Sequence, residues 1–346
     1  MTSIRTVTLA AAQMDANPAP VVDRLARAER LVVEAARSGA QLVVLPELFS
    51  VGYTYEESNY SRAEPLNGPS VSWMKDTAAQ LGIYLAGSVL LREGDEIYNA
   101  LLLWASDGRM WRYDKVYPWA WERAFFRRGR GTTIANTELG RIGLLICWDV
   151  GHRNLWRQYA GQVDLMVISS CPPDAAHPTY HMPDGHTVSL DQLGPLVSSA
   201  TRAGERVFGD VMSEQVGWLG VPAVNAMGCG QIRTPVPNGR VMILGMAPMA
   251  PRLLRFVGQA HGLQMSCGLM QGCRILDADG QTVAAVKQEQ GESCAVAQVE
   301  IETARPQPRE KQPAMGLPWM TYLLSDVLIP GISAVSYRRN RQSAGS

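Results

Sequence analysis

The stretch "GLLICWDVGH", residues 143–152, ends an apolar run on a thiol and then turns. The run begins slightly earlier, as "RIGLLIC" at 141–147, and is typical of a buried strand. Cys147 alone carries little information, because cysteine is among the residue types most often buried as small hydrophobic side chains. A thiol becomes a nucleophile only where its anion is accessible. The rest of the chain must therefore supply groups that accept its proton or stabilise its charge.

Strands and amphipathic helices alternate around this stretch. In 21–36, apolar residues that include Val22 and Leu25 recur at helical spacing. Residues 172–195 are expected to form a loop, and 227–262 are hard to assign. The order predicts one α/β domain with mixed sheets and helices on the outside. Further strands or hairpins are expected at 7–14, 40–47, 83–90, 98–105, 165–170, 221–226, 272–286 and 294–301, and helices at 70–81 and near 190–208.

Composition bounds the class of protein. The chain has 346 residues, 46% of them hydrophobic, which is ample for one large core. Its 32 Lys and Arg residues balance 32 Asp and Glu residues, so no nucleic-acid partner is expected. None of the six cysteines forms a C-x-x-C pair, which argues against a zinc site or a secreted disulfide scaffold and favours a cytoplasmic location. The N-terminal "MTSIRTVTLAAAQM" is interpreted as a first strand, because its apolar part is too short for a signal peptide.

The end of the chain holds one strongly hydrophobic segment, "LPWMTYLLSDVLIPGISAVSY", residues 317–337. It is about long enough to span a bilayer, but Asp326, Pro330 and Gly331 interrupt it. A packed C-terminal arm is therefore expected rather than a membrane-spanning helix. Attachment to a membrane surface stays open as the alternative, because the basic cluster "RRNR" follows at 338–341.

Four polar residues lie beside apolar strands, where a charge is costly unless it is paired. Glu47 ends "VVLPE", Lys115 and Glu122 lie in "YDKVYPWAWERAFF", and Cys147 ends its own strand. A carboxylate can accept the thiol proton and return it to a leaving amine. A fixed ammonium group and the backbone N–H of Trp148 can stabilise the oxyanion that forms. The set suits nucleophilic hydrolysis, although Lys115 and Glu122 could also be an ordinary exposed ion pair.

In order and spacing, "LPELF", "DKVYPWAWE" and "LLICWD" resemble the three signatures of the nitrilase superfamily of carbon–nitrogen hydrolases. The resemblance implies an α/β fold, specifically a four-layer α–β–β–α sandwich with two mixed sheets. It implies Glu47 as general base, Lys115 as the oxyanion-stabilising cation and Cys147 as the nucleophile, acting through a thioester. Glu122 matches a second glutamate that the superfamily places beside the site.

The resemblance also implies how the chain is organised. A carbon–nitrogen hydrolase domain is expected over residues 1–305 and a C-terminal arm over 306–346, in a homodimer or larger homo-oligomer. It implies a small-molecule substrate and neither a cofactor nor a metal.

The residue two positions after the nucleophile bears on the substrate. Amide-hydrolysing members tend to have Asp there and nitrile-hydrolysing members Glu, and this chain has Asp149. A small amide or N-carbamoyl compound is therefore expected, with nitrile hydrolysis as the alternative. The continuation "VGHRNLWR" departs from the amidase pattern of an aromatic residue, Pro and Glu, which leaves the subfamily open. A catalytically weak binding or regulatory subunit, and acyl transfer to an amine or lipid, are further alternatives.

The substrate is expected to contact Tyr53, Trp119, Trp148 and Asp149. Trp121 adds to the aromatic character of this region, although aromatic residues are as often plain core.

Two other groups of residues have simpler interpretations. Cys171 is expected to be structural, and Met246, Met249 and Met265 to be adaptable packing residues. His177, His181 and His186 invite a metal site, but the prolines between them prevent one helix from presenting all three. Their segment is expected instead to line the pocket or to form a lid.

Overall fold

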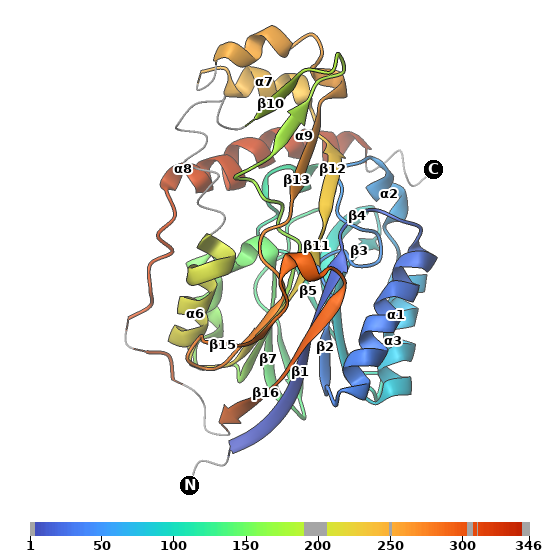
Figure 1. Cartoon of the computed structure of the whole chain (residues 1–346), viewed down its shortest axis with the longest axis vertical. Helices are drawn as coiled ribbons and strands as arrows, with labels where there is room; N and C mark the ends of the chain where they lie inside the picture. Colours follow the sequence, from blue (N-terminus) through green and yellow to red (C-terminus); the bar gives the residue numbers. More distant parts are fainter. Residues whose placement is uncertain (1–3, 190–205, 249–250, 303–306, 310, 341–346) are drawn as a thin grey trace.

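Twelve strands form the larger sheet, in the order β5-β4-β3-β2-β1-β11-β8-β7-β6, with β14, β15 and β16 joined near its middle. The computed structural model describes residues 4–189, 206–248, 251–302, 307–309 and 311–340. The central strand β1 pairs in parallel with β2 and β11 and antiparallel with β16 (Figure 1). The predicted α/β class with mixed strand pairing is confirmed, and the structure places these strands in one large sheet. The strand bounds are β1 (Ile4–Asp15), β2 (Leu42–Val44), β3 (Tyr84–Glu93), β4 (Glu96–Trp104), β5 (Met110–Asp114), β6 (Ile134–Thr137), β7 (Gly140–Ile146), β8 (Leu165–Ser170), β11 (Ala223–Cys229), β14 (Arg274–Leu276), β15 (Thr282–Ala285) and β16 (Ser293–Glu302).

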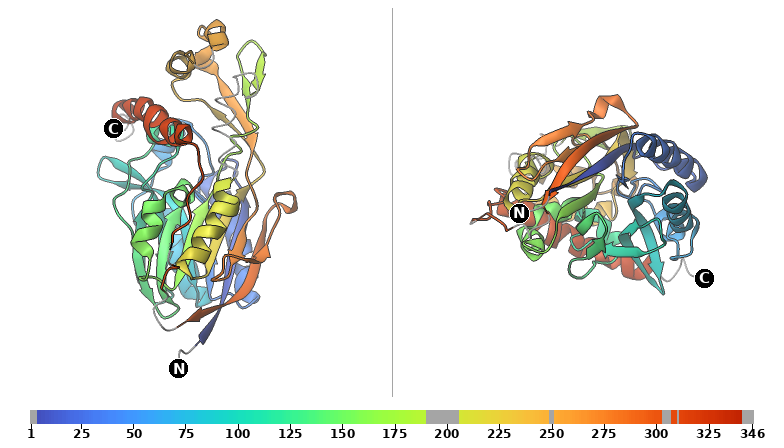
Figure 2. Two further views of the ribbon diagram at one scale, coloured as in Figure 1. Left: turned by 90° about the vertical axis from the view of Figure 1, so that its left-hand side faces the viewer. Right: turned by 90° about the horizontal axis from the view of Figure 1, so that it is seen from below.

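The sheet curls so that its two halves face each other across an apolar core. Residues of β3 and β4 contact residues of β8 and β7, which belong to the other half of the sheet. The view along the strands in Figure 2 shows the teal strands and the green strands on opposite sides. Both faces of the central strands are covered, which explains why β2 and β8 are continuous buried runs rather than alternating ones.

Helices α1 (Val21–Arg37) and α3 (Pro69–Leu81) cover the outer face of the sheet beside β1 to β3. The predicted helix at 21–36 is confirmed, but its first turn is not oriented as expected. Val22 is 71% exposed, whereas Arg24 is buried and donates from Nε to the Phe49 carbonyl at 2.8 Å. Arg24 therefore fixes the loop that follows β2. Other helical segments are α2 (Ser58–Arg62), η1 (Ala120–Ala124), η2 (Cys147–Gly151), α4 (Arg153–Tyr159), η4 (Val207–Val211), α6 (Met212–Leu219) and η7 (Gln288–Gln290).

A second, four-stranded sheet stands above the carboxyl ends of the parallel strands (Figures 1 and 2). With the helical segments beside it, this sheet forms the cap, residues 179–189, 231–248 and 251–268. Its elements are β9 (Thr179–His181), β10 (Thr187–Ser189), β12 (Gln231–Pro235), α7 (Gly239–Met246), η5 (Pro251–Phe256), η6 (Ala260–Gly262) and β13 (Gln264–Gly268).

The cap corrects one prediction from the sequence. The segment 172–195, expected to be a loop, contains the hairpin of β9 and β10, which gains a third strand by pairing of β9 with β13. The hairpin strands are only three residues long, and the partner that stabilises them, β13, lies more than 80 residues away, so the sequence carries little local signal for them. Residues 190–195, and most of the helix expected near 190–208, lie outside the described part of the chain.

The C-terminal arm ends in a helical run, Trp319–Asn340, made of α8 (Trp319–Tyr322), η8 (Leu323–Leu328) and α9 (Ile329–Asn340). By length and composition, this run could cross a membrane. In the fold it lies between the cap and the larger sheet, where α9 contacts η1 and α7 (Figure 1). Ser333 and Tyr337 are buried there, and the Tyr337 hydroxyl accepts from the Ile97 backbone N–H at 2.9 Å. The arm therefore helps to build the surroundings of the site.

Candidate active site

Three strands that run in the same direction deliver the polar residues to one place. Glu47 follows β2, Lys115 follows β5 and Cys147 follows β7. The chain of parallel pairings through β1, β11 and β8 gives β2 and β7 the same direction, and two antiparallel pairings give it to β5. Because the sheet curls, their carboxyl ends meet beneath the cap.

Lys115 lies between two carboxylates. Its Nζ donates to Glu47 Oε1 at 2.7 Å and lies 2.7 and 2.9 Å from the two carboxylate oxygens of Glu122. All three residues are buried, with 0% of Lys115, 2% of Glu47 and 1% of Glu122 exposed. The ordinary exposed ion pair that the sequence left open is therefore not what the chain forms. A buried cation with two acidic partners is a fixed centre of positive charge.

Each carboxylate is also held by donors other than the lysine. Glu47 accepts from Asn99 Nδ2 at 2.7 Å and from the Cys171 backbone N–H at 3.0 Å. Glu122 accepts from the Tyr53 hydroxyl at 2.6 Å and from the Trp119 backbone N–H at 2.7 Å. These contacts restrict both carboxylates to one orientation. Sequence reasoning missed Asn99, whose only signal is a polar side chain within the apolar run of β4.

The backbone at the site is strained. Cys147 has a φ of 47°, Leu48 one of 53° and Ala120 one of 44°, all in the left-handed region that side chains other than glycine rarely adopt. Each lies on the turn that carries a polar residue of the site, or directly beside it. At Cys147 the strand β7 turns abruptly into η2, and Cys147 lines the pocket, with 3% of the residue exposed.

Burial and charge together set the protonation of the site. Burial acts to lower the pKa of Lys115, but the carboxylates of Glu122 and Glu47 outweigh it and raise that pKa well above its ordinary value. Burial and the charge of Glu47 raise the pKa of Cys147 well above its ordinary value, against the opposing effect of Lys115. The Cys147 thiol is therefore neutral at neutral pH, and it would need a base to act as a nucleophile. Burial also raises the pKa of Glu122 from 4.5 to about 7.

We expect the raised pKa of Glu122 to be measurable as a dependence of stability on pH. A group whose pKa is higher in the folded state stabilises the fold below its unfolded pKa, and that contribution is lost as the pH rises through the folded pKa. Relative to Glu122→Gln, which stays neutral, the wild type should lose up to about 3 kcal/mol of unfolding free energy between about pH 4.5 and 7. Urea unfolding of both proteins across this window tests it. A wild type that gains stability relative to the variant would contradict it.

Asp149 supports the turn at Cys147 and does not reach the pocket. It is fully buried, and its carboxylate accepts from the Tyr113 hydroxyl at 2.9 Å and from the Tyr117 backbone N–H at 2.7 Å. The Ile146 backbone N–H donates to the same carboxylate at 3.3 Å. Asp149 does not line the pocket, whereas Tyr53 does.

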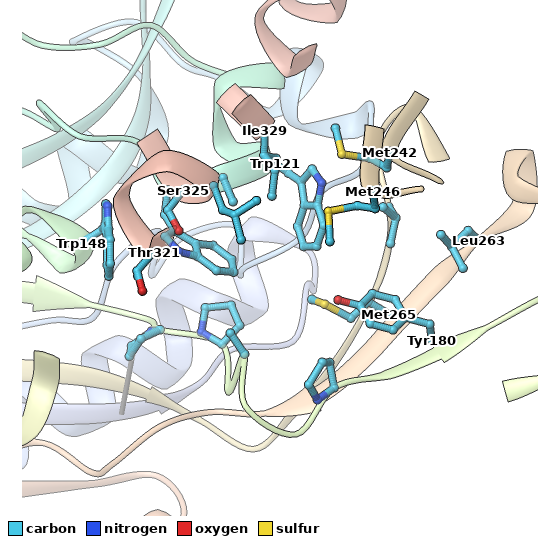
Figure 3. A pocket seen from close by; sticks show the side chains of 18 of the residues that line it. Trp121, Trp148, Tyr180, Met242, Met246, Leu263, Met265, Thr321, Ser325 and Ile329 are labelled. Atoms are coloured by element: carbon cyan, nitrogen blue, oxygen red, sulfur yellow. The ribbon is translucent and has the colours of Figure 1, made fainter. Parts of the chain in front are cut away.

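A pocket of about 150 Å³ opens at Cys147 and runs beneath the cap. The predicted Tyr53, Trp119 and Trp148 all line it, as does Trp121. Figure 3 shows Trp148 at one end, and Met246 and Leu263 of the cap at the other. The segment 172–189 contributes to the wall, at Pro172, Pro173, Ala175, Pro178, Tyr180, Met182 and Val188.

The three histidines of that segment do not converge on a metal site. His177 lies 3.0 Å from Asp174, His181 bonds Ser266 at 2.7 Å, and His186 lies 3.0 Å from Asp184. The described residues hold no cluster of three potential metal ligands.

The C-terminal arm binds the turn that carries Cys147. Asp326 of η8 accepts from Trp148 Nε1 at 2.7 Å, and its other oxygen lies 2.9 Å from His152 Nε2. The Tyr322 hydroxyl donates to the Gly151 carbonyl at 2.8 Å. Asp326, which the sequence presents as a charge interrupting a hydrophobic segment, thus attaches the arm to the wall of the pocket.

We expect Asp326→Ala to loosen this wall. Losing a hydrogen bond to a charged group should reduce the unfolding free energy by about 1–3 kcal/mol. A displaced Trp148 should also lower kcat/KM by about tenfold, since small shifts in positioning are costly. Asp326→Asn keeps an oxygen that can accept from Trp148 and should retain most of the activity. Urea unfolding and steady-state kinetics on both variants measure this, and equal kinetics for the alanine variant and the wild type would refute it.

Comparisons with known proteins agree with this geometry. The sequence model for carbon–nitrogen hydrolases matches residues 8–206, more than half of the chain. A nitrilase of Pyrococcus abyssi is 33% identical over 127 residues, covering 36% of this chain and 48% of that protein. The bifunctional nitrilase/nitrile hydratase NIT4B of Lupinus angustifolius is 36% identical over 147 residues, covering 36% and 42%. The match thus spans about half the length of these curated relatives, or less.

Solved structures extend the likeness over most of the chain. XC1258 of Xanthomonas campestris, a CN-hydrolase superfamily protein, has a TM-score of 0.61 and 18% identity, covering 87% of this chain and 92% of that one. An amidase of Nesterenkonia sp. AN1 has a TM-score of 0.59 and 18% identity, covering 84% and 90%. At this identity the likeness concerns the fold alone.

Proposed function

Since the chain belongs to the carbon–nitrogen hydrolase family, we propose that it hydrolyses a non-peptide carbon–nitrogen bond of a small molecule through a thioester on Cys147. One observation carries the proposal: a buried lysine, held by two buried carboxylates, lies beside a thiol that lines a pocket. An ordinary core cysteine has no need of such neighbours.

In the first half of the reaction, Cys147 attacks the substrate's carbonyl carbon. Because burial keeps the thiol neutral, Glu47 takes its proton as the carbon–sulfur bond forms. The carbonyl oxygen becomes an oxyanion, which Lys115 Nζ and the Trp148 backbone N–H stabilise. The carbon–nitrogen bond then breaks, and the departing nitrogen takes the proton back from Glu47.

In the second half, water replaces the thiol. Glu47 removes a proton from the water molecule as its oxygen attacks the thioester carbon. The same donors stabilise the second oxyanion, and the carbon–sulfur bond then breaks to release the acid, while the Cys147 sulfur takes the proton back from Glu47. Glu122 takes no proton in this scheme: it accepts from Lys115, Tyr53 and Trp119 and thereby fixes the position of the ammonium group.

We favour an amide or N-carbamoyl compound as substrate, because Asp149 is the residue typical of amide-hydrolysing members. Nitrile hydrolysis is the second candidate, and the names of the curated relatives favour it. With a nitrile, the Cys147 thiol would add to the nitrile carbon and form a thioimidate. Water then converts the thioimidate to the same thioester, with loss of ammonia.

Intact-protein mass spectrometry during turnover tests the proposal. The panel holds amides, carbamoyl amines and nitriles that share the same acyl groups. We expect a mass increase equal to one acyl group, mapped by peptide analysis to Cys147, with ammonia or an amine released. Comparing amide and nitrile precursors of one acyl group then decides the branch. No adduct and no release from any panel member would favour a catalytically weak binding subunit instead.

We propose four further properties because they are typical of the family. They are the four-layer α–β–β–α arrangement, the division into a domain over 1–305 and an arm over 306–346, a homo-oligomeric state and a cytoplasmic location. That all six cysteines are free thiols supports the last of these.

A further inference from the structure

We propose that the acyl group of the substrate is an uncharged, apolar chain or ring, which lies in the pocket from Cys147 to the inner face of the cap. The inference rests on the proposed function, since it names the substrate class of that same site. It excludes substrates that carry a second charge at the far end, which includes N-carbamoyl amino acids.

The side chains that line the pocket indicate that the acyl group is uncharged. No Asp, Glu, Lys, Arg or His lines the pocket within the described part of the chain. The polar groups of the lining side chains, apart from the thiol, are uncharged hydroxyl and indole N–H groups. Four lining residues bear a hydroxyl, and that of Tyr53 already donates to Glu122; three bear an indole N–H, and that of Trp148 already donates to Asp326. The other hydroxyl groups are those of Tyr180, Thr321 and Ser325, and the other indoles are Trp119 and Trp121. A carboxylate or ammonium group at the cap end of the pocket would be buried without a counter-charge from any lining residue that the structure describes, which is expensive.

The size and extent of the pocket indicate that the acyl group is longer than an acetyl group. It begins at Cys147 and Trp148 and reaches Met246, Leu263 and Met265 of the cap, which Figure 3 shows well separated from Trp148. One water molecule needs about 10–15 Å³ on this measure of volume, so a pocket of about 150 Å³ takes a multi-atom group. The cavity therefore suits an extended acyl group better than the acyl group of acetamide.

The segments of the chain that form the wall indicate that the pocket accepts apolar groups of different shape. The far wall comes from the cap, with Val236, Met242, Ile243, Met246, Leu253, Leu263 and Met265, and one side comes from the arm, with Thr321, Leu324, Ser325 and Ile329. Methionine side chains are flexible and polarisable, so they adapt to apolar groups of different shape. We therefore expect tolerance of apolar chains and rings rather than selection of one shape.

Two matched comparisons test the proposal in the wild type. Across butanamide, hexanamide and octanamide, kcat/KM should rise about fourfold per methylene until the pocket is full. The monoamide of adipic acid has the length of hexanamide with a terminal carboxylate, and should react on the order of a hundredfold more slowly. The corresponding nitriles are assayed in parallel, so the result does not depend on the branch. A flat chain-length series, or equal rates for the two matched amides, would overturn the proposal.

One substitution in the cap should reverse the preference. Met246→Lys places a cation at the far end of the pocket, and should lower kcat/KM for octanamide while raising it for adipic acid monoamide. Leu244→Lys is the matched control, because Leu244 lies on the same helix but is 55% exposed and outside the pocket wall. It should leave both rates within about twofold of the wild type. An identical effect of the two lysines would contradict the placement of the acyl group.

A binding measurement separates this proposal from the proposed function. Trp119, Trp121 and Trp148 line the pocket, so a ligand should change the tryptophan fluorescence of Cys147→Ala. Octanamide should bind this variant at least about tenfold more tightly than adipic acid monoamide does. If octanamide binds but the wild type forms neither adduct nor ammonia, hydrolysis is wrong and the apolar preference stands. If hydrolysis occurs and the charged amide binds as tightly as octanamide, the proposed function stands and the apolar preference is wrong.

Discussion

Cys147→Ala is expected to lower kcat/KM by on the order of 10⁴-fold or more, because it removes the atom that forms the covalent bond. The fold should survive. Alanine also has a Cβ, so the left-handed conformation at this position becomes no worse, and only one buried sulfur atom is lost. Steady-state kinetics with the substrate that gives the adduct measure the loss of activity, and a urea unfolding curve of the variant measures its stability.

Cys171 provides the control for this prediction. Its thiol is also buried, and burial together with the charge of Glu47 raises its pKa well above the ordinary value, so the two cysteines share an environment. What Cys171 gives to Glu47 is its backbone N–H, which Cys171→Ala retains. This variant should therefore lose less than about tenfold in kcat/KM. A larger loss for Cys171→Ala than for Cys147→Ala would reassign the nucleophile.

The sequence predicts the position of the polar residues better than it predicts what holds them. Glu47, Lys115 and Cys147 each follow an apolar run, and strands of one direction bring their ends together. The elements themselves were equally readable: the helices at 21–36 and 70–81 and most strands lie within a few residues of their predicted bounds. Such patterns are local, since burial on one face repeats along the element.

Partners far apart in the chain account for what the sequence did not reveal. Asn99 binds Glu47 across 52 residues, and Asp326 binds Trp148 across 178. Neither pairing leaves a periodic signal, because a single polar side chain in an apolar run looks the same whether or not it has a partner. Asp149 shows the converse. Its position two residues after Cys147 suggests substrate contact, but three hydrogen-bond donors around its carboxylate hold it inside the turn, away from the pocket.

The cap was missed for a related reason. Its sheet joins strands from two distant segments, and its helix α7 is rich in glycine and methionine, which have weak or ambiguous preferences. Met246 and Met265 were expected to be packing residues, and both line the pocket. Met249 lies outside the described residues.

Lys115→Met should reduce activity and stability together. Losing one oxyanion donor typically costs about 10²–10³-fold in kcat, and Lys115 is also the only cation bonded to Glu47 and Glu122 among the described residues, so we expect about 10³-fold or more in kcat/KM. Two buried carboxylates without their counter-charge should also reduce the unfolding free energy by about 3–5 kcal/mol at neutral pH. Methionine has nearly the same length, so a cavity should contribute little to either loss.

The two losses can be separated because they have different causes. The stability loss comes from unpaired negative charge, so Lys115→Met combined with Glu122→Gln should recover part of the unfolding free energy. Lowering the pH should act in the same direction in the single variant, because loss of the Lys115 charge raises the pKa of Glu122 further and protonation removes the unpaired negative charge. Neither change restores a positive charge beside the oxyanion, so kcat/KM should remain at least about 10³-fold below the wild type. Activity that returns together with stability would show that Lys115 only holds the fold, and that the oxyanion is stabilised elsewhere.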